Sequence, residues 1–224
     1  MEDCITRSSD IISDGSDLQE AYNLELQCIE GKTVRLGELI LDKGDHITTI
    51  VVFIRHFFCA YDQDYVRSVA HHLSDSILSA KSQSGDSIQL IIIGCGDPSL
   101  IVPYVAETGA SQFPIYSDPS GRVYEKLHMR RTVENIMRPP AYTKTGFWKS
   151  LGITFKQMMA QGKKAFRGGG WGQNGGEWVF RGGRCEYVHR MGHVSDHLTA
   201  DELLRILDCR EGRGSIDCDK QFEE

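Results

Sequence analysis

Several features of common protein classes are missing from this sequence of 224 residues. Arg55 and His56 interrupt the longest apolar run, so no stretch reaches the roughly 18 residues that a membrane-spanning helix needs. The first twenty residues have no basic start followed by an apolar core, which argues against a secretory or transit signal. The net charge is -6, whereas proteins that bind duplex nucleic acid usually carry a basic surplus. We therefore predict a protein that binds neither membranes nor nucleic acid.

The cysteines follow neither a disulfide pattern nor a metal-binding pattern. There are seven of them, an odd number at irregular spacing, and this usage favours a reducing compartment. No pair of Cys-x-x-Cys motifs is present, and His193 and His197 have no third ligand near them in the sequence. We predict a cytoplasmic protein without a metal or a cofactor. The 40% hydrophobic and 25% charged residues are typical of a globular protein with a packed core.

Predicted strands and helices alternate in the middle of the chain. Residues 47–54 are almost wholly apolar and β-branched, which predicts a strand covered on both faces. From Asp62 onward, apolar residues recur at a spacing of about 3.6, which predicts an amphipathic helix. We then expect a strand at 88–94, a helix at 98–109, a strand at 113–117 and a helix opened by Asp118-Pro119. This order indicates a parallel core sheet with right-handed crossovers.

Antiparallel elements are expected on both sides of this core. Residues 24–41 alternate between apolar and polar side chains around a turn, which predicts a hairpin-like lead-in. Residues 176–191 form a second predicted hairpin around a Gly-Gly turn. A closing helix follows, in which Thr199 is the cap and Glu202 lies three places on.

The chain is predicted to hold one domain between two irregular ends. Residues 1–20 are acidic and rich in Ser and Asp, so we expect a flexible lead-in, and the charged residues 209–224 read as a tail. The domain spans residues 21–208. Within it, residues 130–175 are an insertion with basic, aromatic and Gly-rich parts. This insertion is expected to form a lid or a dimer surface, or to pack one helix on the sheet.

Several segments resemble one protein family in the same order. Residues 51–66 read VVFIRHFFCAYDQDYV, which is similar to the F-x-R-H-F-x-C-x-x-C motif of the peroxiredoxin-like 2 proteins, a subgroup of the AhpC/TSA antioxidant superfamily. Other matching segments are LQCIEGKTVRLGEL, IYSDPSGRVYEKLHM, the GG before EWVF, and YVHRMGHVSDH. The resemblance covers residues 20–208. It implies an α/β protein with a thioredoxin-like fold, whose mixed central sheet has a parallel core plus a C-terminal antiparallel hairpin and is flanked by helices.

The sequence departs from this family beside the cysteine of the motif. The subgroup has Cys-x-x-Cys, whereas residues 59–62 read C-A-Y-D, so the nearby second thiol is missing. Asp62 cannot attack a mixed disulfide or condense with a sulfenic acid. The Thr-x-x-Cys of typical peroxiredoxins is also absent, because His56 stands three residues before the cysteine. Gly175 or Gly176 stands where those enzymes tend to keep an arginine.

Cys59 is predicted to lie in the turn between the first core strand and its helix. Amide groups and the helix dipole favour an anion there, so we expect the thiol to ionise below its reference pKa of about 8.5. Arg55 and His56 would strengthen this effect, and one of them would stabilise the oxygen that leaves when the thiolate attacks a peroxide. The alternative is an inert cysteine buried against Phe57 and Phe58.

Asp62 allows three interpretations. A carboxylate in the first turn stabilises the helix, by about 1 kcal/mol or less. Its charge near the sulfur opposes formation of the thiolate. As a proton donor or acceptor for a substrate it would need a raised pKa and hydrogen-bond reach.

Further candidates surround this site. The substrate-binding candidates are Phe57, Phe58, Gly175 and Arg190. Arg190 has the alternative of pairing with an acidic neighbour in the fold. Cys95 ends a core strand and is either a resolving thiol or a core cysteine, whereas Cys4, Cys209 and Cys218 reach Cys59 only if a tail folds back or a partner chain supplies them.

The leading functional hypothesis is a peroxiredoxin-like thiol oxidoreductase that reduces a peroxide or a related small molecule. Its catalytic candidates are Cys59, His56, Arg55 and Asp62, and its expected partners are the substrate, an external thiol reductant and a second copy of the chain. Two alternatives remain open. One is a non-redox enzyme that performs acid-base chemistry on a specialised metabolite. The other is a redox-silent module that binds a ligand or a partner.

Overall fold

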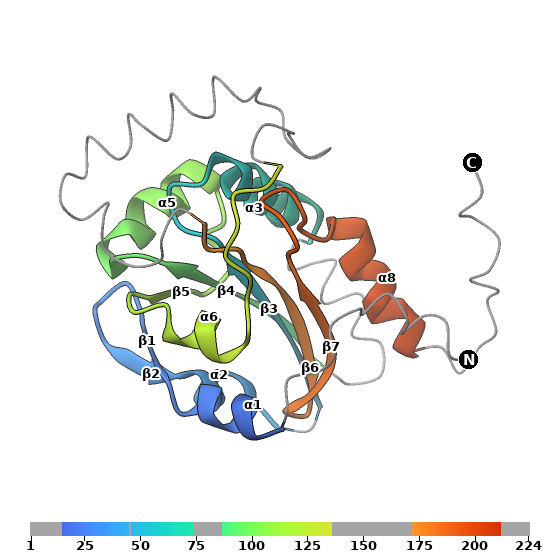
Figure 1. Ribbon diagram of the computed structural model, residues 1–224. Coiled ribbons are helices and arrows are strands. Elements are labelled where there is room, and N and C mark those ends of the chain that lie inside the picture. Colours follow the sequence, from blue (N-terminus) through green and yellow to red (C-terminus); the bar gives the residue numbers. More distant parts are fainter. Residues whose placement is uncertain (1–14, 45, 74–86, 136–171, 212–224) are drawn as a thin grey trace, which may run out of the picture.

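The computed structural model describes residues 15–44, 46–73, 87–135 and 172–211, which form a sheet with helices on both faces (Figure 1). The strands are β1 (Glu25–Gln27), β2 (Thr33–Arg35), β3 (Ile47–Ile54), β4 (Ser87–Cys95), β5 (Ile115–Asp118), β6 (Gly176–Arg181) and β7 (Arg184–Arg190). The helices are α1 (Gly15–Tyr22), α2 (Leu36–Ile40), α3 (Ala60–His72), η1 (Pro98–Leu100, a 3₁₀ helix), α5 (Ile101–Thr108), α6 (Arg122–Lys126) and α8 (Ala200–Glu211). Within the described residues, the strand order is β2-β1-β5-β4-β3-β6-β7.

The centre of the sheet is parallel, as the sequence predicts. β3 pairs with β4 in a register that places Ile50 opposite Leu90, and β4 pairs with β5 so that Ile92 lies opposite Ile115. Every residue of β3 except the first is buried. This accounts for its unbroken run of β-branched and apolar residues, because both faces of a parallel sheet are covered.

Antiparallel pairs extend this core on both sides. β6 runs antiparallel to β3, and β7 runs antiparallel to β6. The turn between β6 and β7 has Gly182 and Gly183 at φ values of 52° and 75°, a region that glycine enters without steric cost. At the other edge, β1 pairs antiparallel with both β2 and β5. Both predicted hairpins are therefore confirmed.

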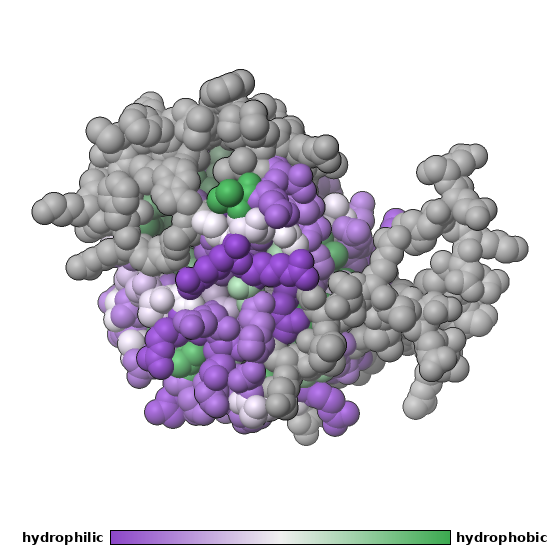
Figure 2. Space-filling model, viewed as in Figure 1, coloured by the Kyte–Doolittle hydropathy of each residue, from purple (hydrophilic) through white to green (hydrophobic). Residues whose placement is uncertain are grey.

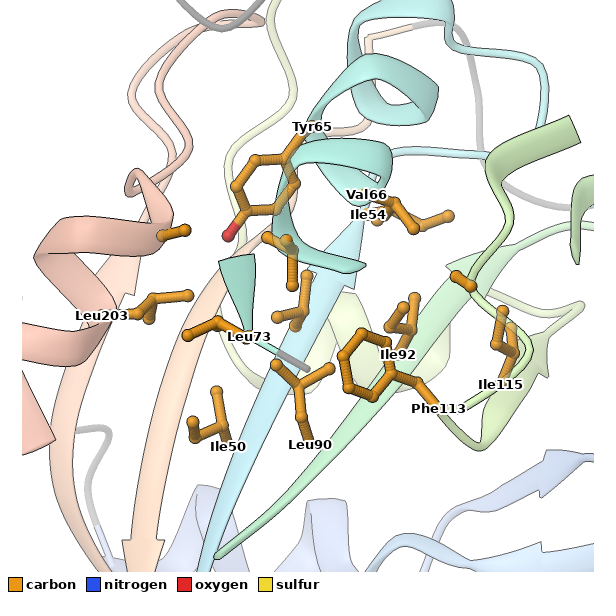
Figure 3. Packing of buried hydrophobic residues seen from close by; sticks show 14 of the residues in the cluster. Ile50, Ile54, Tyr65, Val66, Leu73, Leu90, Ile92, Phe113, Ile115 and Leu203 are labelled. Atoms are coloured by element: carbon orange, nitrogen blue, oxygen red, sulfur yellow. The ribbon is translucent and has the colours of Figure 1, made fainter. Parts of the chain in front are cut away.

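Two apolar clusters hold the helices against the two faces of the sheet. Alternate β3 residues such as Ile50 and Ile54 face α3, α5 and α8, while Val51 and Phe53 face α1, α2 and α6. Figure 3 shows Leu203 of α8 beside Leu73 at the end of α3, and Ile50 beside Leu90 of the sheet, all in the first cluster. Burying one such side chain stabilises the fold by about 1.5–3 kcal/mol, so these clusters fix the position of α3 and of the turn before it.

Three boundaries differ from the expectation. α6 begins at Arg122 and not at Asp118, because the Asp118 carboxylate accepts hydrogen bonds from the N–H groups of Gly121 and Val123, both at 2.8 Å. The expected lead-in at 1–20 overlaps α1, which is held by an ion pair of 3.1 Å between Lys126 and Asp17. α8 runs beyond residue 208 to Glu211, and thus into the expected tail.

The two ends of the expected insertion are joined at its base. The N–H of Thr132 donates to the carbonyl of Gly172 at 2.7 Å, and the N–H of Asn174 donates to the carbonyl of Arg130 at 3.0 Å. The proposed lid or dimer surface falls mainly on residues 136–171, which lie outside the described residues. What the structure does show is that residues 172–175 are brought to the end of β3, where Cys59 lies.

The described surface is mostly hydrophilic on the face that Figure 2 shows. Its large exposed apolar residues lie on separate segments: Ile29, Leu41, Val102 and Val133. In the described ranges no helix combines the length and the apolar character needed to cross a membrane.

Candidate active site

The turn from β3 to α3 places Cys59 at the amino end of the helix. Cys59 is the cap residue, with extended backbone angles of φ -71° and ψ 112°, and its carbonyl accepts a hydrogen bond of 2.9 Å from the N–H of Gln63. The Gln63 side chain donates back to the carbonyl of Phe57 at 3.0 Å. These bonds fix the turn, so the predicted position of Cys59 between strand and helix is confirmed.

The sulfur of Cys59 lies between a cation and an anion. Arg55 donates a hydrogen bond from Nη1 to Sγ at 3.3 Å. The backbone N–H of Asp62 also acts on the sulfur and favours the thiolate, while the charge of the Asp62 carboxylate acts against it. The Cys59 residue is only 5% exposed. The site therefore has the cationic and amide groups expected for a reactive thiol, together with a carboxylate that acts against them.

The expectation that Cys59 ionises readily is wrong. Burial raises the pKa of the Cys59 thiol to about 12, and the negative charge of Asp62 acts in the same direction. Arg55 and the Asp62 N–H lower this pKa, but by less than burial raises it. At neutral pH the resting side chain is thus a thiol.

His56 does not supply the second positive charge that the sequence suggested. Burial and the neighbouring Arg55 guanidinium lower the pKa of His56 to about 4, and the attraction of Asp62 offsets only part of this effect. His56 is neutral at neutral pH, because a second cation beside Arg55 is costly. Arg55 is the cation that contacts the sulfur.

Arg55 is held in place by the base of the insertion. Its side chain is buried, and its Nε donates to the carbonyl of Gln173 at 3.0 Å. The side-chain oxygen of Gln173 accepts a second bond of 3.0 Å from Nε of Arg131. The segment at 172–175 therefore positions the guanidinium against Cys59, a role that sequence spacing does not reveal because Gln173 lies 118 residues from Arg55.

Asp62 is fully buried and ionised. Its Oδ2 accepts a hydrogen bond of 2.6 Å from the backbone N–H of Arg55, and its Oδ1 lies 3.4 Å from Nε2 of His197. Burial raises the pKa of Asp62, but His197, Arg55 and His56 lower it by more, so the net direction is downward. The raised pKa that a lasting proton donor or acceptor would need is not found.

A chain of acidic and imidazole side chains continues from Asp62 away from the sulfur. His197 contacts Glu177 at 2.5 Å, Glu177 contacts His189 at 2.7 Å, and His189 lies 3.6 Å from Asp196. Sequence reasoning considered His197 only as a metal ligand and did not single out Glu177. A signal was present, since Glu177 is a charged residue inside the apolar run of β6, where an acid must be paired if it is buried.

The other site candidates lie in packed positions. Phe57 packs edge-on against Tyr104 with ring centroids 5.2 Å apart, and Phe58 belongs to the same apolar cluster. Gly175 touches the carbonyl end of β3 so closely that an added Cβ would lie 1.7 Å from the Phe53 oxygen. Arg190 donates to the Leu127 carbonyl at 2.7 Å, and its guanidinium lies over the Trp178 ring.

The remaining described cysteines are not paired with Cys59. Cys95 is buried in the cluster beneath α6, on the sheet face opposite the one that α3 covers. Burial and the charge of Asp118 raise the pKa of Cys95 well above its usual value. Cys28 and Cys185 are in no disulfide, and the terminal candidates Cys4 and Cys218 lie outside the described residues. Among the described residues, no group of three or more His, Cys, Asp or Glu side chains is arranged to hold a metal ion.

Comparison with known proteins relates the chain to the same family that its motifs resemble. The model of the AhpC/TSA antioxidant enzyme family matches residues 72–193, a range that begins after Cys59. Peroxiredoxin-like 2C of Bos taurus is 34% identical over 185 residues, covering 79% of this chain and 73% of that protein. Peroxiredoxin-like 2C of Mus musculus is 28% identical over 185 residues, covering 79% and 74%. A reduced peroxiredoxin of Vibrio vulnificus, solved in complex with hydrogen peroxide, has a TM-score of 0.54 at 12% identity, covering 83% of this chain and 94% of that one.

The mixed sheet and the cysteine at the start of α3 define a thioredoxin-fold protein of the peroxiredoxin type. The chain belongs to the AhpC/TSA antioxidant enzyme family and, within it, to the peroxiredoxin-like 2 subgroup. The predicted resemblance and fold class are therefore confirmed. Together they support a function of the thioredoxin-fold redox type.

Proposed function

We propose that the protein is a thiol oxidoreductase in which Cys59 reduces a peroxide or a related oxidised small molecule. The observation that carries this proposal is the hydrogen bond of 3.3 Å from Arg55 to the Cys59 sulfur at the start of α3. A guanidinium in this place stabilises negative charge on sulfur and on the oxygen that leaves. The odd number of cysteines suits a reducing, cytoplasmic location, which is part of the proposal.

Asp62 is the group that takes the thiol proton in this scheme. Its carboxylate is ionised and its charge acts on the Cys59 thiol, and because its pKa is lowered it holds the proton only transiently, while the sulfur attacks. The sulfur then attacks one peroxide oxygen, so an S–O bond forms and the O–O bond breaks. Sulfur is oxidised to a sulfenic acid, the peroxide is reduced, and the proton on Asp62 passes to the departing oxygen to give water or an alcohol.

An external thiol returns Cys59 to its starting state in this proposal. A first thiol condenses with the sulfenic acid, releasing water and forming a mixed disulfide, and a second thiol reduces this disulfide. Cys95 is a poor substitute, because its sulfur is buried in a different cluster and its raised pKa keeps it protonated. Asp62 occupies the position where a second thiol would otherwise stand.

The direct test is to treat the intact protein with one equivalent of hydrogen peroxide and to trap sulfenic acid with dimedone before mass spectrometry. We expect the adduct on Cys59, and none on that peptide in Cys59→Ser. The oxidation rate should fall at least about tenfold in Asp62→Asn, because the proton acceptor is lost. Neither an adduct nor a disulfide at Cys59 in the wild-type protein would exclude the proposal.

One observation favours a second candidate, a redox-silent module that binds a ligand or a partner. Cys59 is buried and protonated, as a packing cysteine would be. Such a module would keep its binding in both Cys59→Ser and Asp62→Asn. Acid-base chemistry on a metabolite is less well supported, since the Asp62 side chain is 0% exposed and a substrate would have to reach it.

A further inference from the structure

Five ionisable side chains form a continuous line from the Cys59 site toward the surface. Asp62 on α3, His197 before α8, Glu177 on β6, His189 on β7 and Asp196 alternate between acid and imidazole, with successive contacts of 3.4, 2.5, 2.7 and 3.6 Å. The side chains of the first three are 0% exposed, whereas that of Asp196 is 37% exposed. The proposed oxidation uses only the first of the five.

The geometry around His197 favours a positively charged ring, because buried carboxylates flank both of its nitrogens, one within hydrogen-bond reach and one at an ion-pair distance without a hydrogen bond. Its Nδ1 faces a Glu177 oxygen at 2.5 Å, and its Nε2 faces an Asp62 oxygen at 3.4 Å. A neutral imidazole carries one N–H, so it can donate toward only one of two carboxylates, whereas an imidazolium donates toward both. The ring of Tyr65 stacks on His197 at 4.1 Å and 8°, which fixes the plane in which both nitrogens point at the acids.

The charges in this line balance across the site. Asp62 lies beside the His197 ring and feels the charge of Arg55, whose backbone N–H it accepts from, and Glu177 lies between His197 and His189. The other ionisable groups near Asp62 are His56, which is neutral, Cys59 and Tyr104, whose hydroxyl donates to the Asp62 backbone carbonyl at 3.3 Å. Removing one cation from such a buried set leaves an acid without its partner, and a proton is the nearest substitute.

We infer that His197 is a positioning residue that holds Asp62 as a carboxylate beside the Cys59 thiol and thereby keeps the proton acceptor of the oxidation available. The effect of His197 on catalysis rests on the proposed function. Its effect on the charge of Asp62 does not. Glu177 and His189 support it by holding the far side of the His197 ring. His197 touches neither the sulfur nor a substrate, so it acts through Asp62.

The test measures the titration of Asp62 in the full chain by carbon-13 NMR of labelled aspartate carboxyl groups. In His197→Gln we expect the pKa of Asp62 to rise by about one unit or more, a tenfold or larger change in proton affinity. The matched control is His128→Gln, which removes an imidazole that pairs with Asp17 at 2.7 Å but is 60% exposed and belongs to the α1–α6 surface. The control should leave the Asp62 titration unchanged.

The rate of Cys59 oxidation provides the second readout. As pH falls, the wild-type rate should hold until Asp62 is protonated, and in His197→Gln this loss should begin at a pH higher by the same shift. A folded His197→Gln protein with an unchanged Asp62 titration overturns the inference. If that variant does not fold, nitrogen-15 NMR of the wild-type protein decides, because a neutral His197 ring at neutral pH also overturns it. Wild-type protein that resists peroxide while Asp62 still shifts in the variant would count against the proposed function alone.

Discussion

At the scale of single residues, Asp62 stands where the family motif has a second cysteine, and this carboxylate places different demands on the residues around it. A buried carboxylate needs partners, and Asp62 accepts a hydrogen bond from the Arg55 backbone N–H and lies 3.4 Å from the His197 ring in an ion pair. The same carboxylate makes Cys59 harder to ionise. The proposed oxidation therefore relies on a base beside the thiol, whereas a low thiol pKa would make such a base unnecessary.

Gly175 is the residue at which one added carbon should damage both fold and site. In Gly175→Ala the new Cβ would lie 1.7 Å from the Phe53 carbonyl oxygen, and that backbone atom cannot move without disturbing the pairing of β3 with β6. We expect a loss of about 3 kcal/mol in the free energy of unfolding, at the upper end of overpacking costs. Gly172→Ala is the control, since its nearest contact is 3.5 Å. Urea unfolding curves would compare them, and equal stability of the two variants would contradict this account.

At the scale of elements, local signals explain where α8 begins. The Thr199 N–H and hydroxyl donate to the Glu202 carboxylate at 2.7 and 2.8 Å, and the Glu202 N–H lies 3.3 Å from the Thr199 hydroxyl oxygen. This is the reciprocal capping pattern that the sequence predicts. Leu203 and Leu207 then bury one side of the helix against the sheet. The cap thus also fixes the chain that carries His197.

Thr199→Ala should cost about 1 kcal/mol of stability, because the Glu202 N–H loses its side-chain acceptor. Glu202→Gln should cost less, since glutamine can also accept from the cap. Thermal or urea unfolding of the full chain measures both. A larger loss in the glutamine variant than in the alanine variant would show that the charge of Glu202, and not the cap, stabilises this end of α8.

At the scale of the whole molecule, three histidines whose pKa values shift in opposite directions set the response to pH. The pKa of His197 is raised to about 9 and that of His189 to about 10, since their carboxylate partners outweigh the cost of burial. The pKa of His56 is lowered to about 4 by burial and Arg55. The unfolded chain titrates all three near pH 6.5.

Stability should therefore be greatest near pH 6.5. Above it, the unfolded histidines lose protons that His197 and His189 keep in the fold, so their contribution declines as pH rises through about 9 and 10. Below it, His56 binds a proton in the unfolded chain, whereas in the fold it stays neutral until about pH 4. Stability therefore decreases as the pH is lowered from 6.5 to about 4. The slope should be at most on the order of 1.4 kcal/mol for each pH unit and group. Urea midpoints measured from pH 4 to pH 10 test this, and a midpoint that rises between pH 6.5 and pH 9 would contradict it.

The sequence by itself determined the order of elements and the position of the thiol. The apolar runs of β3 and β4, the Gly-Gly turn and the spacing in α3 are local patterns, so they identify strands, a hairpin and a helix without knowledge of distant residues. For the same reason, the place of Cys59 between β3 and α3 was predictable. The prediction that the helix dipole would lower the pKa of Cys59 also used only local information. It was wrong because it omitted the burial that raises this pKa.

Only the tertiary structure decided the charge state of the site. Gln173 contacts Arg55, and His197 contacts both Asp62 and Glu177. These residues lie far apart along the chain, and no local pattern specifies that they meet. Whether a thiol, an acid or an imidazole is charged depends on desolvation and on the charges around it. Those quantities exist only after the sheet, α3 and the segment before α8 have packed together.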